Sequence, residues 1–184
     1  MQQDDETTSP QEDGQGHSHS TPLQLNTCLD LAEAVVLLTN GCTCHRNEAK
    51  DLIANGITHN EPLFINLFTR LLSSIENNKP LKMVRVVEKS NGRRKHKAYY
   101  FRSSFLMAAL REHPNLFPEK YLHMIIKATR PFCLKLLETD VDEYTCKLFA
   151  AACKLSGVYD AELTRVIQEI KAVDAMVDSM QNNF

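Results

Sequence analysis

The sequence predicts a mostly α-helical protein: a single helical bundle, or a short ARM/HEAT-like helical stack, with one inserted basic β-hairpin at about residues 82–101. Two observations carry this prediction. Apolar residues recur at intervals of three and four over most of the chain after residue 23, which is the period of an α-helix. The exception is one short region where β-branched and aromatic residues flank an Asn-Gly pair, which is typical of a hairpin.

Three helices are expected before the hairpin. The first ends at Gly41, a residue type that often caps helices at their C-terminus. The second is expected at about 46–55, because Asn55-Gly56 would end it. The third has Pro62 in its first turn and a broad apolar stripe, so it should be largely buried.

The hairpin is the sharpest local prediction. Its first strand lies within Leu81–Lys89 and its second within Lys97–Phe101, with Asn91-Gly92 in the connection between them. Both turn residues tolerate positive φ, which the tight turns of hairpins require. The region is therefore predicted to form a β-hairpin over about 82–101.

Four helices are expected after the hairpin, at about 103–112, 118–138, 141–156 and 160–181. Pro131 predicts a kink or break near Arg130 in the second of these. The last helix carries apolar residues with the 3-4-3-4-3 spacing of a coiled-coil seam. The residues of this seam are Leu163, Val166, Ile170, Val173, Val177 and Met180.

The seam has two interpretations. It can be the core-facing stripe of an ordinary bundle helix, which Ile167 and Met176 would widen. It can instead bind a partner helix or a second copy of the chain as a homodimer. The sequence favours the core-facing stripe, because two and a half heptads are short for an autonomous coiled coil.

The net charge of −2 conceals a strong segregation of charge. Residues 1–23 contain five acids and no Lys or Arg, and their polar composition predicts a disordered acidic tail before a helical domain at 24–184. Residues 79–102 contain nine cations and only Glu88 as an acid, a balance of +8. We hypothesise that the tail competes with an anionic partner for this basic segment.

Clustered Lys and Arg indicate that the hairpin contacts an anion, and two partners remain open. Nucleic acid, either DNA or RNA, would be held mainly through its phosphates and without strong sequence readout. The alternative is a protein–protein adaptor that uses the hairpin, the C-terminal helix or both to bind an acidic protein surface. A solvated hairpin without a binding role is the third possibility. The candidate residues are Lys82, Arg85, Lys89, Arg93, Arg94, Lys95, His96, Lys97, Tyr100 and Arg102.

Cys42, Cys44 and His45 form a Cys-x-Cys-His group whose side chains are of the types that zinc prefers. Cys28 and His59 are further candidates if the fold brings them close. A structural zinc site usually has a second, separated pair of ligands, and none lies nearby in the sequence. The sequence therefore favours small residues at a helix–loop junction, with no metal and no cofactor.

Several function classes find no support in the sequence. It contains no nucleophile-elbow motif, no Gly-rich phosphate loop and no His-Glu-x-x-His motif, so we expect a non-enzymatic protein acting in a larger complex. It contains no run of eighteen apolar residues and no signal peptide, which predicts no membrane partner and no secretion. Together with the resemblance of Arg93–Lys97 to a nuclear-import patch, this predicts a nuclear or cytoplasmic protein whose cysteines are reduced.

Overall fold

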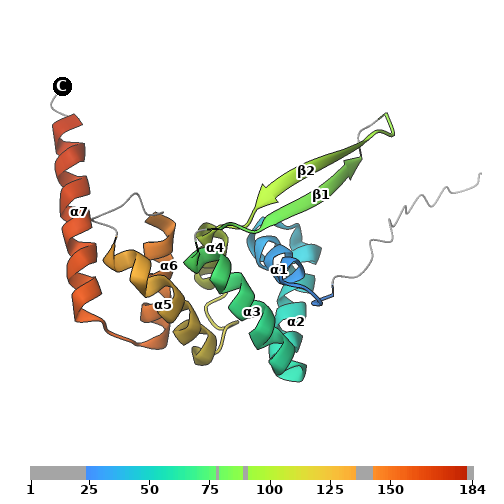
Figure 1. The fold of residues 1–184 in the computed structure, drawn as a ribbon, viewed down its shortest axis with the longest axis horizontal. Helices are drawn as coiled ribbons and strands as arrows, with labels where there is room; N and C mark the ends of the chain where they lie inside the picture. Colours follow the sequence, from blue (N-terminus) through green and yellow to red (C-terminus); the bar gives the residue numbers. More distant parts are fainter. Residues whose placement is uncertain (1–23, 78, 89–90, 136–142, 182–184) are drawn as a thin grey trace, which may run out of the picture.

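The computed structural model describes residues 24–77, 79–88, 91–135 and 143–181. Within them the chain forms seven α-helices and a two-stranded antiparallel sheet, which confirms the predicted helical fold with one inserted hairpin (Figure 1). The predicted acidic tail lies outside the described residues. The elements are α1 (Cys28–Asn40), α2 (Thr43–His59), α3 (Glu61–Glu76), β1 (Lys82–Glu88), β2 (Arg94–Tyr100), α4 (Ser103–Glu112), α5 (Glu119–Leu134), α6 (Glu143–Ser156) and α7 (Ala161–Gln181).

Helix α1 begins at a capping box. The Thr27 hydroxyl accepts a hydrogen bond from the backbone N–H of Asp30 at 3.2 Å, and the Asp30 carboxylate accepts one from the backbone N–H of Thr27 at 2.7 Å. This reciprocal pair satisfies two backbone donors that the start of a helix would otherwise leave open. The helix ends at Gly41, as predicted, and the backbone N–H of Gly41 donates to the carbonyl of Leu37.

Helix α2 is longer than the sequence predicts. It begins at Thr43 rather than at about residue 46, and the predicted stop at Asn55-Gly56 lies inside it. A Cβ atom at Gly56 would lie 3.0 Å from the side chains of both Leu25 and Phe64. Gly56 therefore allows close packing of the helix against its neighbours and does not end it.

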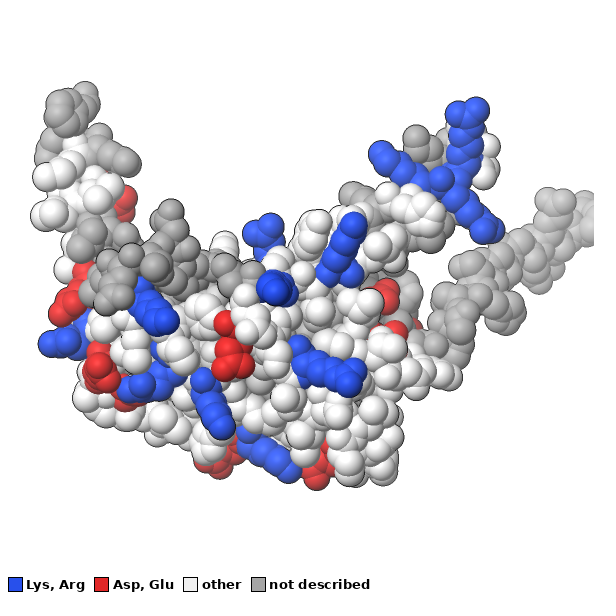
Figure 2. All heavy atoms as spheres, viewed as in Figure 1, with Lys and Arg blue, Asp and Glu red and all other residues white. Residues whose placement is uncertain are grey.

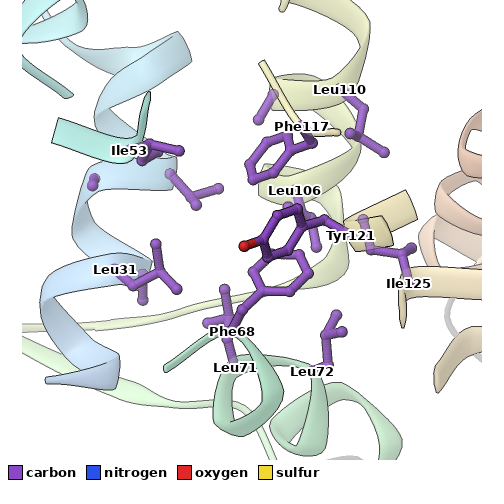
Figure 3. Packing of buried hydrophobic residues seen from close by; sticks show 14 of the residues in the cluster. Leu31, Ile53, Phe68, Leu71, Leu72, Leu106, Leu110, Phe117, Tyr121 and Ile125 are labelled. Atoms are coloured by element: carbon purple, nitrogen blue, oxygen red, sulfur yellow. The ribbon is translucent and has the colours of Figure 1, made fainter. Parts of the chain in front are cut away.

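The main core lies where α1, α3, α4 and α5 meet (Figure 3). Phe64 and Phe68 from α3 are both in edge-to-face contact with the ring of Tyr121 from α5, with centroids 5.3 and 5.4 Å apart. The ring of Phe117 lies 5.8 Å from that of Phe68. These side chains are almost fully buried, so α3 is a central helix, as its broad apolar stripe predicts.

Helix α5 continues through Pro131 and ends at Leu134, within one turn of the proline. The predicted break near Arg130 is therefore not present. Pro131 removes one backbone hydrogen-bond donor from the last turns of the helix, which ends three residues later. Lys135 is the C-cap residue of α5, and residues 136–138 of the predicted helix lie outside the described residues.

Helix α7 is joined to the body through its first turns. The Asp160 carboxylate accepts the backbone N–H of Leu163 at 3.1 Å and pairs with Arg130 at 2.8 Å. Both contacts lower the pKa of Asp160 and keep its carboxyl group ionised. The hydrogen bond from the Arg130 guanidinium has the larger effect, and the hydrogen bond from the backbone N–H of Leu163 the smaller one. Leu163 also enters a second apolar cluster, with Cys133, Cys146 and Phe149. The described residues contain no helix that is both long and apolar enough to cross a membrane.

Strands β1 and β2 form a ribbon that projects from the helical body, with α7 at the opposite end of the molecule (Figure 1). The ribbon is anchored at its base, where the backbone N–H of Phe101 donates to the carbonyl of Leu81 at 2.9 Å. Phe101 is buried, and its ring lies 6.1 Å from that of Phe105 in α4. With seven residues per strand and a rise of about 3.3 Å per residue, the ribbon is about 23 Å long.

Candidate nucleic-acid interface

The strand register assigns each residue of the ribbon to one of two faces. Residues directly opposite each other share a face, and successive residues of a strand alternate between faces. One face carries the predicted site residues Arg85, Lys95 and Lys97 and no Asp or Glu, and we call it the acid-free face. The other face carries Glu88, and we call it the mixed face. The pairs on the acid-free face are Met83–Tyr99, Arg85–Lys97 and Val87–Lys95, and those on the mixed face are Lys82–Tyr100, Val84–Ala98, Val86–His96 and Glu88–Arg94.

On the acid-free face, Arg85 of β1 lies directly opposite Lys97 of β2. Lys95, two residues from Lys97 in β2, adds a third cationic position to the same face. The backbone register thus gathers three cationic positions on one face of the ribbon, and such a face attracts anions.

Further cations lie at the far end of the ribbon. Gly92 has a φ of +73°, as the predicted turn requires, and the Asn91 side chain accepts the backbone N–H of Arg93 at 3.3 Å. Arg93 and Arg94 are exposed there. Figure 2 shows Lys and Arg gathered at this end, where Glu88 of β1 is the register partner of Arg94, whereas both signs of charge are interspersed on the body. Lys89, also a predicted site residue, lies outside the described residues.

The base of the ribbon combines aromatic and basic side chains. Tyr99 and Tyr100 are 38% and 45% exposed, on opposite faces, so both rings reach the surface in part. Lys82, opposite Tyr100, is exposed, as are His96 and Arg102. Arg102 also borders a hollow of about 230 Å³ beside the start of α4. The sequence-predicted residues that the structure describes thus follow the ribbon from its base to its tip.

The structure divides the predicted partner helix into two parts. Leu163 and Val166 are buried in the body, as expected for a core-facing stripe. Val177 and Met180 are exposed by 44% and 58%, although they continue the same spacing. Ile170 and Val173 lie in the helix between these parts. Among the seam residues whose side chains the structure describes, the exposed apolar ones therefore lie in the last part of α7.

Cys42, Cys44 and His45 come together at the start of α2. The Cys42 Sγ lies 2.9 Å from the Cys44 Sγ and 2.9 Å from the His45 Nδ1, and all three atoms lie within 4.8 Å of one another. Two hydrogen bonds lower the pKa of Cys42 to about 7. The one with the Cys44 side chain has the larger effect, and the one with the backbone of His45 the smaller. The same Cys42–Cys44 contact raises the pKa of Cys44. Neither Cys28 nor His59 belongs to this group of described residues.

Sequence reasoning identified these three residues as one group, but it favoured no metal because no separated second pair of ligands lies nearby in the sequence. It also placed them before a helix starting at about 46. In the structure Cys42 is the N-cap residue, with an extended backbone, and the other two side chains come from the first turn of α2.

Comparison with known proteins adds no further assignment. No protein-family model matches the chain, and no curated protein and no solved structure matches it either. The fold and the arrangement of side chains therefore carry the functional argument.

Proposed function

We propose that this protein is a non-enzymatic nucleic-acid-binding component of a larger complex and that the β1–β2 ribbon makes the contact. The observation that carries the proposal is the strand register of a projecting ribbon, which places the cationic positions 85, 95 and 97 on one acid-free face. Clustered Lys and Arg of this kind can neutralise a row of phosphates.

The expected mode of binding is electrostatic. Lys and Arg that neutralise phosphates release condensed counterions, and this term does not depend on base sequence. The partly exposed rings of Tyr99 and Tyr100 add surfaces on which unpaired bases can stack. We therefore expect tight binding at low salt, weak discrimination between base sequences, and a steep loss of affinity as salt rises.

The test is fluorescence anisotropy with labelled single- and double-stranded DNA and RNA across a salt series. The wild-type chain is compared with a ribbon variant in which Arg93, Arg94, Lys95 and Lys97 are all changed to Glu. Each phosphate contact contributes about −0.9 to the slope of log affinity against log salt on duplex DNA, and about −0.7 on single strands. The ribbon variant should lose most of both the affinity and the slope.

The matched control reverses four exposed cations on the helical body, Lys50, Arg111, Lys127 and Lys171, to Glu. It changes the net charge by the same amount as the ribbon variant. We expect it to keep most of the wild-type slope. If the two variants lose binding equally, or if the wild type binds no nucleic acid at low salt, the ribbon is not a nucleic-acid interface. Pull-downs with the same proteins would then test an acidic protein partner.

A second candidate function, protein–protein association through α7, has its own supporting observation. Met176, Val177 and Met180 are exposed by 56%, 44% and 58% near the end of this helix. Three large apolar side chains within five positions of one helix are suited to burial against another helix. The simplest such partner is α7 of a second copy.

Self-association through α7 predicts a mass that depends on concentration. Light scattering after size exclusion should rise from 20.9 kDa toward twice that value as the protein concentration increases. Changing Val177 and Met180 to Glu should abolish the rise, because charges cannot be buried unpaired in an apolar interface. Reversal of exposed Lys171 to Glu serves as the control. A wild type that stays monomeric at all concentrations would exclude this homodimer.

A further inference from the structure

The six cysteines of the chain fall into different environments. Cys133 and Cys146 are buried in the second apolar cluster, where cysteine behaves as a small hydrophobic residue. Cys42 and Cys44 are exposed, although free cysteine is among the most buried residue types. Two exposed thiols within three residues of each other, with an imidazole next to them, are not explained by packing.

The backbone brings these three side chains together. Cys42 precedes α2 with a φ of −65° and a ψ of 166°, so its side chain lies beside the first turn of the helix. Cys44 and His45 are in that first turn. The sulfur of Cys42 lies 2.9 Å from the Sγ of Cys44 and 2.9 Å from the Nδ1 of His45. The sulfur of Cys42 is thus central to a compact set of two sulfurs and one nitrogen.

The dimensions of this set fit a small thiophilic cation. With Zn–S bonds of about 2.3 Å and Zn–N bonds of about 2.0 Å, tetrahedral geometry separates sulfur from nitrogen by about 3.5 Å and sulfur from sulfur by about 3.8 Å. The observed contacts of 2.9 Å are shorter than these separations, so the ligand atoms must move apart by less than about 1 Å to admit the ion. Both thiols are exposed, which leaves room for that rotation. The start of a helix also favours thiolates, through its partial positive charge.

We propose that Cys42, Cys44 and His45 form a three-ligand Zn²⁺ site at the start of α2, with the fourth position held by water. Binding forms two Zn–S bonds and one Zn–N bond, and any protons on the two thiols are released to solvent. Three protein ligands leave the fourth position of the ion open to water or another ligand, unlike a closed four-ligand structural site. The sequence analysis favoured no metal because no second pair of ligands lies nearby. The proposal departs from it because the structure shows the three side chains in mutual contact, and a site with water in the fourth position needs no second pair.

The test uses the full chain, reduced and stripped of metal, and Co²⁺ as a spectroscopic probe for Zn²⁺. Titration without oxygen should produce thiolate-to-cobalt charge-transfer bands that saturate at one Co²⁺ per chain. One equivalent of Zn²⁺ should then remove these bands, since Zn²⁺ binds such sites more tightly than Co²⁺. A wild type that develops no saturable charge-transfer bands would overturn the proposal.

Single variants identify the ligands. C42S, C44S and H45A should each weaken Co²⁺ binding by more than about tenfold, because even loss of an outer-shell partner costs about 10- to 100-fold. C153S, which changes a cysteine outside the group, is the matched control and should titrate like the wild type. Circular dichroism of each variant confirms that the fold is retained. If H45A binds Co²⁺ as tightly as the wild type, the imidazole is not a ligand and the three-ligand site is wrong.

Discussion

Replacing Phe68 with alanine is expected to lower the free energy of unfolding by about 3–5 kcal/mol. Phe68 is fully buried, and its ring lies within 6 Å of three other rings, those of Phe64, Phe117 and Tyr121. Truncation removes the apolar contacts of the ring and leaves a cavity that its neighbours only partly fill. Urea unfolding, followed by far-ultraviolet circular dichroism, measures the change.

The control for this substitution is Tyr159→Ala, another aromatic-to-alanine change. Tyr159 is 77% exposed, so its replacement should alter the free energy of unfolding by no more than about 0.5 kcal/mol. A loss below about 1 kcal/mol for Phe68→Ala would contradict the placement of this ring cluster at the centre of the core.

Replacing Leu163 with alanine is expected to release α7 from the body without unfolding the rest of the protein. Leu163 is fully buried in the second apolar cluster, apart from the aromatic core. A Leu→Ala change in a packed site costs about 2–5 kcal/mol. Since 1.4 kcal/mol corresponds to a factor of ten, amide hydrogen exchange in α7 should accelerate by roughly 30-fold or more. Mass spectrometry of peptides from α7 and from α1–α3 measures the two regions separately.

Met180→Ala is the matched control on the same helix. Met180 is 58% exposed, so its truncation should leave hydrogen exchange in α7 unchanged. The prediction concerns α7 alone. Equal acceleration in α1–α3 and α7 after Leu163→Ala would show that the two regions unfold as one cooperative unit.

The hairpin was predictable because its signals are local. Asn91-Gly92 and the β-branched and aromatic residues on either side indicate a hairpin without help from the rest of the chain, although β2 begins at Arg94, three residues before the predicted second strand. The segregation of charge is equally visible in the sequence. The strand register added what composition cannot show, namely that Arg85 lies opposite Lys97 on a face without acids. Only pairing across the strands identifies which cations are neighbours.

Other features depend on contacts between distant residues. Gly56 resembles a helix stop in the sequence, but in the structure it allows α2 to pack closely against Phe64 of α3. The seam of α7 keeps one spacing throughout, yet Leu163 is buried and Met180 exposed. Hydrophobic periodicity identifies the face of a helix, but it cannot show how far along that face the neighbouring helices reach.

By itself the sequence determined the helical fold class, the position of the hairpin and the concentration of positive charge on it, because these follow from residues close together in the chain. The tertiary structure decided how much of each apolar face is covered, because that depends on which helices meet. It also decided where α2 begins, and thereby brought Cys42, Cys44 and His45 within reach of one another. The sequence identified these three residues as a group, and the structure shows their side chains in contact because Cys44 and His45 lie in the first turn of α2.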